Sequence, residues 1–310
     1  MTLHPPNSEK HGPIQIRKEQ NLTRKPSKFN RRALLTTILA GGLTAPSIVS
    51  TQKTATEQKS NDPYLQRNPL LWAVAWSNTA AEFGALCHQA FNLAKLRVKQ
   101  AKLRHAGSRR PLAVITDIDN TIFHAGSYWS HLIDRGIDFF DDEIWDRWIP
   151  TNLISLVPGA LEFLTYCKEQ EVEVFYVTNR DQGTETYNYA LRQLQYLELP
   201  YADSEHLTVF RDSSDKTPAR EGVKQSHELV LLLGDNLNDF KRDYYLANIE
   251  QRFELMERDR QEVGDRFIVL PNPTDGHWVR AIFGESEPAP TKENRSILLE
   301  AVKKGAWGGE

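Results

Sequence analysis

Two carboxylates and a hydroxyl follow the most apolar strand pattern in this sequence. The stretch AVITDIDNTIF places Asp117 directly after a run of apolar and β-branched residues, with Asp119 and Thr121 at the next alternate positions. Two neighbouring carboxylates repel each other unless a cation compensates their charge or a pKa rises. Such a pair therefore points to metal binding or to acid–base chemistry rather than to a simple strand end.

Polar groups also end two later apolar runs. VEVFYVTNR ends in Thr178 and Asn179, and ELVLLLGDNLNDF continues into Asp235, with Asp239 four positions later. One such end could be a turn or a helix cap, but three together indicate a site. Carboxylates without His or Cys suit Mg²⁺, and the hydroxyl and amide could bind a phosphate. Lys216, in SSDKTPAR between these two runs, could supply a cation to phosphoryl oxygens.

The elements that would position these groups alternate along the chain. Apolar, β-rich runs lie at residues 112–116, 173–178, 229–233 and 267–270, and helical patterns lie at about 158–170, 183–198, 216–226 and 237–263. This order predicts an α/β fold with a mainly parallel sheet that is covered on both faces. Ligands bind beyond the carboxyl ends of the strands in such sheets, so the three polar ends should meet at one edge.

The composition is that of a globular protein with a basic leader. Of 310 residues, 40% are hydrophobic and 25% are charged, which is enough for one large domain with a cap. The whole chain has a net charge of −3 and residues 1–50 contribute +6, so the remainder carries −9. An acidic body argues against a nucleic-acid polymer as partner. Cys87 and Cys167 both lie in apolar helical patterns and are expected in the core, although one disulfide between them stays open.

The N-terminal segment has the order of an export signal. Arg31 and Arg32 precede an uncharged run from Ala33 to Gln52 that contains Thr, Gly, Pro and Ser. This pattern predicts a twin-arginine-type signal peptide and export to the periplasm or beyond, without a stable membrane anchor after cleavage. A disordered basic tail and an organellar transit peptide are the alternatives.

The strand ends DIDNT, VTN and GDNLND, with Lys216 between the last two, resemble the four motifs of the haloacid-dehalogenase (HAD) phosphatase superfamily. VITDIDNTIF, VFYVTNR, LLLGDNLNDF and VLPNP…HW are more narrowly similar to the class C acid phosphatases, subfamily IIIB, of the lipoprotein-e type. The segment LLWAVAWSNTAAEFGALCHQAFNLAK also looks like the N-terminal helices of that family, so the resemblance spans residues 70–284. It implies a three-layer α/β/α, Rossmann-like HAD fold with a smaller helical cap.

The resemblance also implies a role for each polar group. Asp117 would be the nucleophile that forms an aspartyl-phosphate, and Asp119 would be the general acid and then the general base. Mg²⁺ would be held by Asp117, by Asp235 and by the main-chain carbonyl of Asp119. The remaining groups would bind phosphate (Thr178, Asn179 and Lys216), brace the loop (Thr121) or orient the metal waters or Lys216 (Asp239).

Some positions depart from the family pattern. The family usually has Glu where this chain has Asn120, often Asp where it has His124, and commonly Asp where it has Asn238. None of these changes removes a catalytic group, but they leave the substrate pocket undefined. Tyr128 and Tyr245 match family aromatics and are candidates for stacking on a substrate.

These patterns predict an exported, Mg²⁺-dependent acid phosphatase for small phosphomonoesters, including nucleoside 5′-monophosphates. The alternatives are a phosphatase for another small phosphate, such as a sugar phosphate, and a non-catalytic storage or binding protein on the same fold. A homodimer is one option for its assembly. The expected organisation is a signal and basic leader (1–50), a linker (51–68), a phosphatase domain (69–285) with cap helices at 70–105 and about 125–150, and a tail with a short helix (286–310).

Overall fold

The computed structural model describes residues 68–307. The predicted signal peptide lies outside these residues, as does the predicted linker apart from Asn68. In the described part of the chain, no helix is both long and apolar enough to cross a membrane. Cys87 and Cys167 are free, buried thiols, as expected from the apolar patterns around them.

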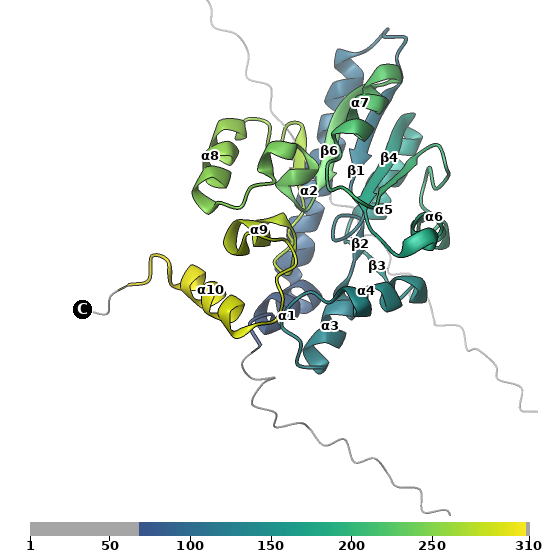
Figure 1. Ribbon diagram of the computed structural model, residues 1–310. Coiled ribbons are helices and arrows are strands. Elements are labelled where there is room, and N and C mark those ends of the chain that lie inside the picture. Colours follow the sequence, from purple (N-terminus) through teal and green to yellow (C-terminus); the bar gives the residue numbers. More distant parts are fainter. Residues whose placement is uncertain (1–67, 308–310) are drawn as a thin grey trace, which may run out of the picture. The chain divides into compact units, whose positions relative to one another are not determined.

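A five-stranded parallel sheet forms the centre of the molecule (Figure 1). Its strand order is β5-β4-β1-β6-β7, with bounds Leu207–Phe210, Val172–Asn179, Leu112–Thr116, Glu228–Gly234 and Phe267–Val269. In the central register Val114 lies opposite Val174 on one side and Leu231 on the other. Four of these strands occupy the predicted apolar runs. The fifth, β5, is a short edge strand that the pattern of apolar residues did not reveal.

Alternate side chains of the strands enter two separate cores, one on each face of the sheet. Val114, Val174 and Leu231 pack in the larger core with helices α2 (Ala81–Arg104), α5 (Ala160–Glu169) and α6 (Thr186–Tyr196). Ala113, Ile115 and Val177 face the other way, toward α7 (Thr217–Ser226). The helices α2 and α7 accordingly lie on opposite sides of the sheet in Figure 1. This α/β/α layering agrees with the predicted fold class, because a strand such as β1, in which every residue is buried, requires cover on both faces of the sheet.

A helical cap region packs around its own aromatic cluster. It contains α1 (Leu71–Thr79), α3 (Gly126–Asp134), α4 (Asp142–Trp148) and the short turn η2 (Ile149–Thr151), and a two-stranded antiparallel pair, β2 (Phe123–His124) and β3 (Ser155–Leu156), joins it to the body. Tyr128, Trp129, Trp145 and Trp148 are buried in this cluster. The Asp141 carboxylate begins α4 by accepting a 2.9 Å hydrogen bond from the amide of Ile144.

The single helix predicted over 237–263 is wrong. The structure has two short turns, η4 (Leu237–Asp239) and η5 (Arg242–Tyr244), before helix α8 (Ile249–Asp259). The side chains of Asn236 and Asp239 bond reciprocally to each other's backbone, which caps the start of the short turn η4 directly after β6. The Asn248 side chain then caps a new helix by accepting from the amide of Gln251 at 2.9 Å.

The chain ends in two helices beside the cap, α9 (His277–Phe283) and α10 (Lys292–Lys303). Phe283 of α9 meets Phe139 of the cap edge to face, with ring centroids 5.9 Å apart. Arg295 of α10 binds both carboxylate oxygens of Asp138 at 2.6 and 2.8 Å. No residue of α10 is buried, so this helix adds surface contacts to the cap and no side chain to the hydrophobic core.

Candidate active site

The predicted polar residues meet at the carboxyl edge of the sheet. Asp117 follows β1, Thr178 and Asn179 end β4, and Asp235 follows β6, and these are the three central strands. Together with Lys216, which precedes α7, they line a cavity of about 660 Å³. The parallel register delivers all three strand ends to one place, as the sequence pattern predicted.

Lys216 is the cation at the centre of this site. Its ammonium group lies 2.7 Å from an oxygen of Asp239 and also donates a short hydrogen bond to Asp117. Only 3% of the Lys216 side chain is exposed, so the group is almost removed from water. Burial alone would lower the pKa of Lys216, but the charges of Asp117 and Asp239 outweigh it and raise that pKa. The lysine is therefore held as a cation.

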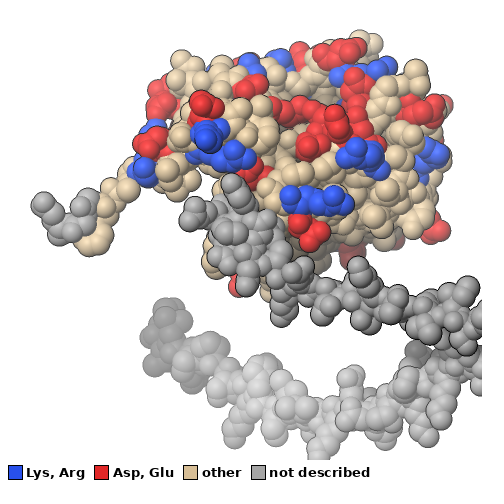
Figure 2. Space-filling model, turned by 60° about the horizontal axis from the view of Figure 1, so that its bottom comes forward, with Lys and Arg blue, Asp and Glu red and all other residues tan. Residues whose placement is uncertain are grey.

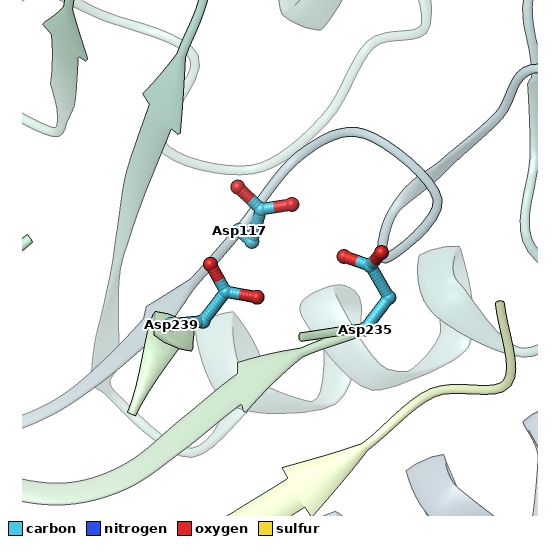
Figure 3. Close-up of side chains that lie close together, drawn as sticks. All are labelled: Asp117, Asp235 and Asp239. Carbon is cyan, nitrogen blue, oxygen red and sulfur yellow. The ribbon is translucent and has the colours of Figure 1, made fainter. Parts of the chain in front are cut away.

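Three carboxylates nevertheless outnumber this one lysine. Figure 3 shows the side chains of Asp117, Asp235 and Asp239 pointing toward one another, and one oxygen from each lies within 4.8 Å of the others. Burial raises the pKa of Asp117 to about 7, although the charge of Lys216 opposes the shift. Burial also raises the pKa of Asp235 well above its usual value, and the charges of Asp239 and Asp117 add to this shift.

Asp235 has the environment of a metal ligand. It accepts hydrogen bonds from Thr121 at 3.1 Å, from Asn236 at 3.0 Å and from Asn272 at 2.7 Å. Among the described residues it has no ion-pair partner, in contrast to Asp117 and Asp239. A divalent cation between the carboxylates would supply the missing positive charge, and an all-oxygen donor set suits a hard cation. The residues present therefore fit a divalent metal.

The loop after β1 is a tight turn that aims both acids into the cavity. The amides of Ile122 and Phe123 both bond to the carbonyl of Ile118, at 2.9 and 2.8 Å. Thr121 is fully buried, and its hydroxyl lies 3.1 Å from Asp235 and 3.4 Å from Asp117, where it can bridge β1 and β6. This placement is compatible with the bracing role expected of Thr121.

Asn120 turns the same loop. Its φ of 56° lies in the left-handed region, which Asn adopts more readily than most residues. Its side-chain amide donates to Asp275 at 3.0 Å, and Asn272 also donates to Asp275 at 2.8 Å. Burial raises the pKa of Asp275. Asn272 and Asp275 thus belong to the site, although the sequence interpretation had assigned them no role.

Asp119 points to a different partner. Its two oxygens bind Arg180 at 2.5 and 2.6 Å, and Thr178 lies 3.4 Å from one of them. Arg180 directly follows Thr178 and Asn179 at the end of β4, and sequence reasoning assigned it no function. Its position next to two predicted phosphate ligands was the available signal. The Asn179 side chain donates to the carbonyl of Ser213, so it also braces the segment that leads to Lys216.

The two candidate stacking tyrosines differ in position. Tyr128 is fully buried among the cap aromatics, and its hydroxyl accepts from the amide of Asp141 at 2.9 Å. It does not line the cavity, so the expectation that Tyr128 stacks on a substrate is not met; its hydroxyl is used to hold the start of α4. Tyr245 does line the cavity, and the guanidinium groups of Arg242 and Arg280 lie over its ring at 3.7 and 4.3 Å.

Other aromatic rings and charges complete the cavity. Phe140 and Trp145 of the cap line it, together with Arg280 and Glu287 from the C-terminal segment. On the face shown in Figure 2, acidic side chains gather in the middle with basic side chains beside them. His124 lies outside this cavity, and burial lowers its pKa, which favours a neutral ring that packs 5.3 Å from Phe83.

Comparison with known proteins gives a consistent result. Residues 40–278 match the sequence profile of the family described as HAD superfamily, subfamily IIIB (Acid phosphatase). A solved structure of the class C acid phosphatase from Bacillus anthracis superposes with a TM-score of 0.70 at 26% identity, covering 76% of this chain and 97% of that chain. A crystal structure described as class C acid phosphatase from Bacillus anthracis with tungstate bound gives a TM-score of 0.69 at 27% identity, with 77% and 97% covered. The matched residues include every carboxylate that meets at the edge of the sheet.

Proposed function

Because this chain belongs to the acid phosphatases of HAD subfamily IIIB, phosphomonoester hydrolases, we propose that it works through a phosphorylated Asp117 with Mg²⁺. We further propose that its substrates include nucleoside monophosphates and that it is exported. The observation that carries the mechanism is the buried Asp117 carboxylate, bound to Lys216 and braced by Thr121 at the end of β1.

The first half-reaction transfers the phosphoryl group to the enzyme. An oxygen of Asp117 attacks phosphorus, and the bond from phosphorus to the leaving oxygen breaks. Asp119 gives its proton to that oxygen, so the product leaves as a neutral alcohol. The Thr178 hydroxyl, 3.4 Å from Asp119, is placed to bond a phosphoryl oxygen.

The second half-reaction releases phosphate. Asp119, now ionised, takes a proton from water as that water attacks the phosphorus of the aspartyl-phosphate. Lys216 keeps its charge throughout, because its partners hold its pKa above the ordinary value. It therefore offsets the negative charge that builds up on the phosphoryl oxygens.

Mg²⁺ would be held by Asp117, Asp235 and the main-chain carbonyl of Asp119, with Asp239 placed to orient its waters. When bound, it neutralises the carboxylate cluster and polarises the phosphoryl group. Asp239 also binds Lys216 at 2.7 Å and accepts from the amide of Asn236 at 3.0 Å. The contact of this carboxylate with the protein is therefore one that holds the lysine in place.

The cavity supports the proposal of nucleotide substrates. Its volume of about 660 Å³ lies in the range of sites that enclose small organic ligands. Phe140 and Trp145 present aromatic surface in its wall, and a nucleobase is a planar group that stacks on such rings. A phosphate at Asp117 and a base at the cap would span this space.

The decisive experiment compares two Asp→Asn variants of the full-length protein. Phosphate release from p-nitrophenyl phosphate and nucleoside monophosphates is followed with Mg²⁺ and with EDTA. Asp117→Asn should lose at least about 10³-fold in kcat, because the nucleophile is removed. The matched Asp134→Asn, exposed on α3, should keep wild-type activity.

Acid quenching during turnover should also recover phosphate on the peptide that contains Asp117. An active Asp117→Asn variant, or the absence of phosphorylated peptide during turnover, would overturn the covalent mechanism. Undiminished activity in EDTA would overturn the metal requirement.

Export is tested separately, in whole cells. The twin arginines Arg31 and Arg32 are replaced by lysine, which keeps their charge. The double variant should stay in the cell while wild type is exported. Equal export of both proteins would refute the twin-arginine signal and leave the enzymatic proposal untouched.

A further inference from the structure

Arg180 holds both oxygens of the predicted general acid. Nε and a terminal nitrogen of its guanidinium bind the two oxygens of Asp119 at 2.6 and 2.5 Å. The Arg180 side chain is 1% exposed and that of Asp119 is 19% exposed. A two-point contact of planar groups fixes the plane of the carboxylate as well as its position, which a single hydrogen bond cannot do.

A second row of contacts holds the arginine itself. The other terminal nitrogen of Arg180 donates to the side chain of Gln193 on α6 at 2.7 Å. The Gln193 amide in turn donates to the carbonyl of Ile149, in the turn that follows cap helix α4, at 2.6 Å. Gln193 is 1% exposed. The backbone amide of Arg180 bonds to the carbonyl of Phe210 at 3.1 Å, so main chain and side chain are both fixed.

We infer that Arg180, backed by Gln193, is a positioning residue that aims Asp119 at the leaving-group oxygen. This inference rests on the phosphatase mechanism proposed above. Asp119 lines the cavity from a loop, and among the described residues its carboxylate accepts one further side-chain hydrogen bond, from Thr178 at 3.4 Å. Without Arg180 its side chain could rotate among several rotamers, and the fraction aimed at the leaving oxygen would fall.

The role concerns one proton transfer. As the bond between phosphorus and the leaving oxygen breaks and the bond to Asp117 forms, the Asp119 proton moves to the leaving oxygen. While Asp119 is protonated, one of its oxygens accepts from the guanidinium and the O–H on the other donates to the leaving oxygen. The carboxylate left behind accepts at both oxygens, which is the two-point contact seen in the structure. Arg180 touches neither phosphorus nor the leaving group in this scheme and acts only through Asp119.

The test uses two esters that differ in their need for that proton. Glycerol phosphate has a basic alkoxide leaving group that must be protonated, whereas dinitrophenyl phosphate has a leaving group stable as an anion. The quantity measured is kcat/KM, which reports only on steps up to departure of the leaving group. For Arg180→Lys, kcat/KM should fall roughly 10²-fold with glycerol phosphate and less than about 5-fold with dinitrophenyl phosphate.

The ratio of the two kcat/KM values is the deciding number. It does not depend on how much of the variant is folded, because both values scale with the same active fraction. Gln193→Leu, which lies outside the cavity, should change the ratio in the same direction by a smaller factor. Arg192→Lys, an exposed neighbour of Gln193, is the matched control and should leave the ratio unchanged.

Equal losses with both esters would show that Arg180 only supports the fold and would overturn the inference. If Arg180→Lys is inactive with both esters, an unchanged ratio in Gln193→Leu overturns it and a changed ratio upholds it. A wild-type protein inactive toward both esters would instead refute the proposed function, and the inference with it.

Discussion

At the scale of single residues, Asn120 shows how a departure from a family pattern fits its own structure. The residue takes a left-handed backbone conformation, and its amide binds Asp275 across the site. An amide in place of a carboxylate avoids adding another negative charge to a buried acidic cluster. Asn120, for which the sequence alone suggested no role, therefore shapes the turn after β1 and limits the negative charge of the acidic cluster.

The metal site predicts how one carboxylate controls stability. The proposed Mg²⁺, at 100 times its Kd, should raise the free energy of unfolding of wild type by about 2.7 kcal/mol, because an ion bound only by the folded state stabilises that state. Asp235→Asn should lose this gain, since it removes a carboxylate that has no ion-pair partner within residues 68–307. Thermal unfolding with Mg²⁺ and with EDTA measures the difference. An undiminished gain in Asp235→Asn, with Asp134→Asn as control, would place the metal elsewhere.

Lys216 predicts a large difference between two lysines of one segment. Lys216→Gln should destabilise the metal-free protein by about 3–5 kcal/mol, because it leaves buried Asp117 and Asp239 without a cation. Lys224→Gln breaks only an exposed pair with Glu221 on α7 and should cost less than about 1 kcal/mol. Denaturant unfolding in EDTA compares them. Similar small losses would mean that the carboxylates are protonated rather than paired.

At the scale of elements, the sequence predicted the strands, which depend on apolar patterning. It missed the ends and breaks of helices, which depend on specific side-chain contacts. Four strands and the ends that carry Asp117, Thr178 and Asp235 follow from runs of buried residues. The reciprocal bonds between Asn236 and Asp239 that cap η4, and the separate cap at Asn248 that begins α8, are contacts that hydrophobic periodicity does not register. Arg180 was missed for a similar reason, because its partner Asp119 lies 61 residues away along the chain.

The start of α9 predicts a pH effect on stability. Burial lowers the pKa of His277 to about 4, and its Nδ1 lies 2.8 Å from the hydroxyl of Ser286. The unfolded chain takes up a proton near pH 6.5, whereas the folded protein does so only near pH 4, so acidification through this window favours unfolding. The stability lost through His277 on acidification is at most about 3 kcal/mol. None of it is lost above pH 6.5, where the histidine is neutral in both the folded and the unfolded chain.

His277→Gln should therefore lose less stability than wild type as the pH falls through that window. Chemical denaturation at a series of pH values measures the two slopes. His131→Gln, at an exposed position on α3, is the control and should follow wild type. Parallel curves for wild type and His277→Gln would contradict the assignment.

At the scale of the whole molecule, the parts differ in how firmly they are held. The sheet is buried on both faces, whereas α10 has no buried residue and is tied to the cap through Arg295 and Asp138. Local opening requires little free energy where few apolar contacts are lost. Stability should thus fall from the central strands to the C-terminal helix.

Hydrogen exchange should reveal this gradient. Amides of α10 should exchange through local opening, at rates insensitive to mild denaturant, while those of β1 exchange only with global unfolding. Arg295→Gln should speed exchange in α10, because it removes the two-point pair with Asp138, and should leave β1 unchanged, because that pair does not contact the sheet. Exchange of α10 and β1 at one common rate would show a single cooperative unit.

The strand order has a consequence for folding of the chain during its synthesis on the ribosome. The strand made first, β1, lies in the middle of the sheet, and its partners β4 and β6 are synthesised much later. No neighbouring strands of this sheet are joined by a hairpin, so folding waits for contacts between distant parts of the nascent chain. Asp117 emerges early, but its partner Lys216 follows much later, and Asp275, which binds Asn120 of the same loop, is made only near the end of translation. The active site can therefore assemble only when synthesis of the chain is almost complete.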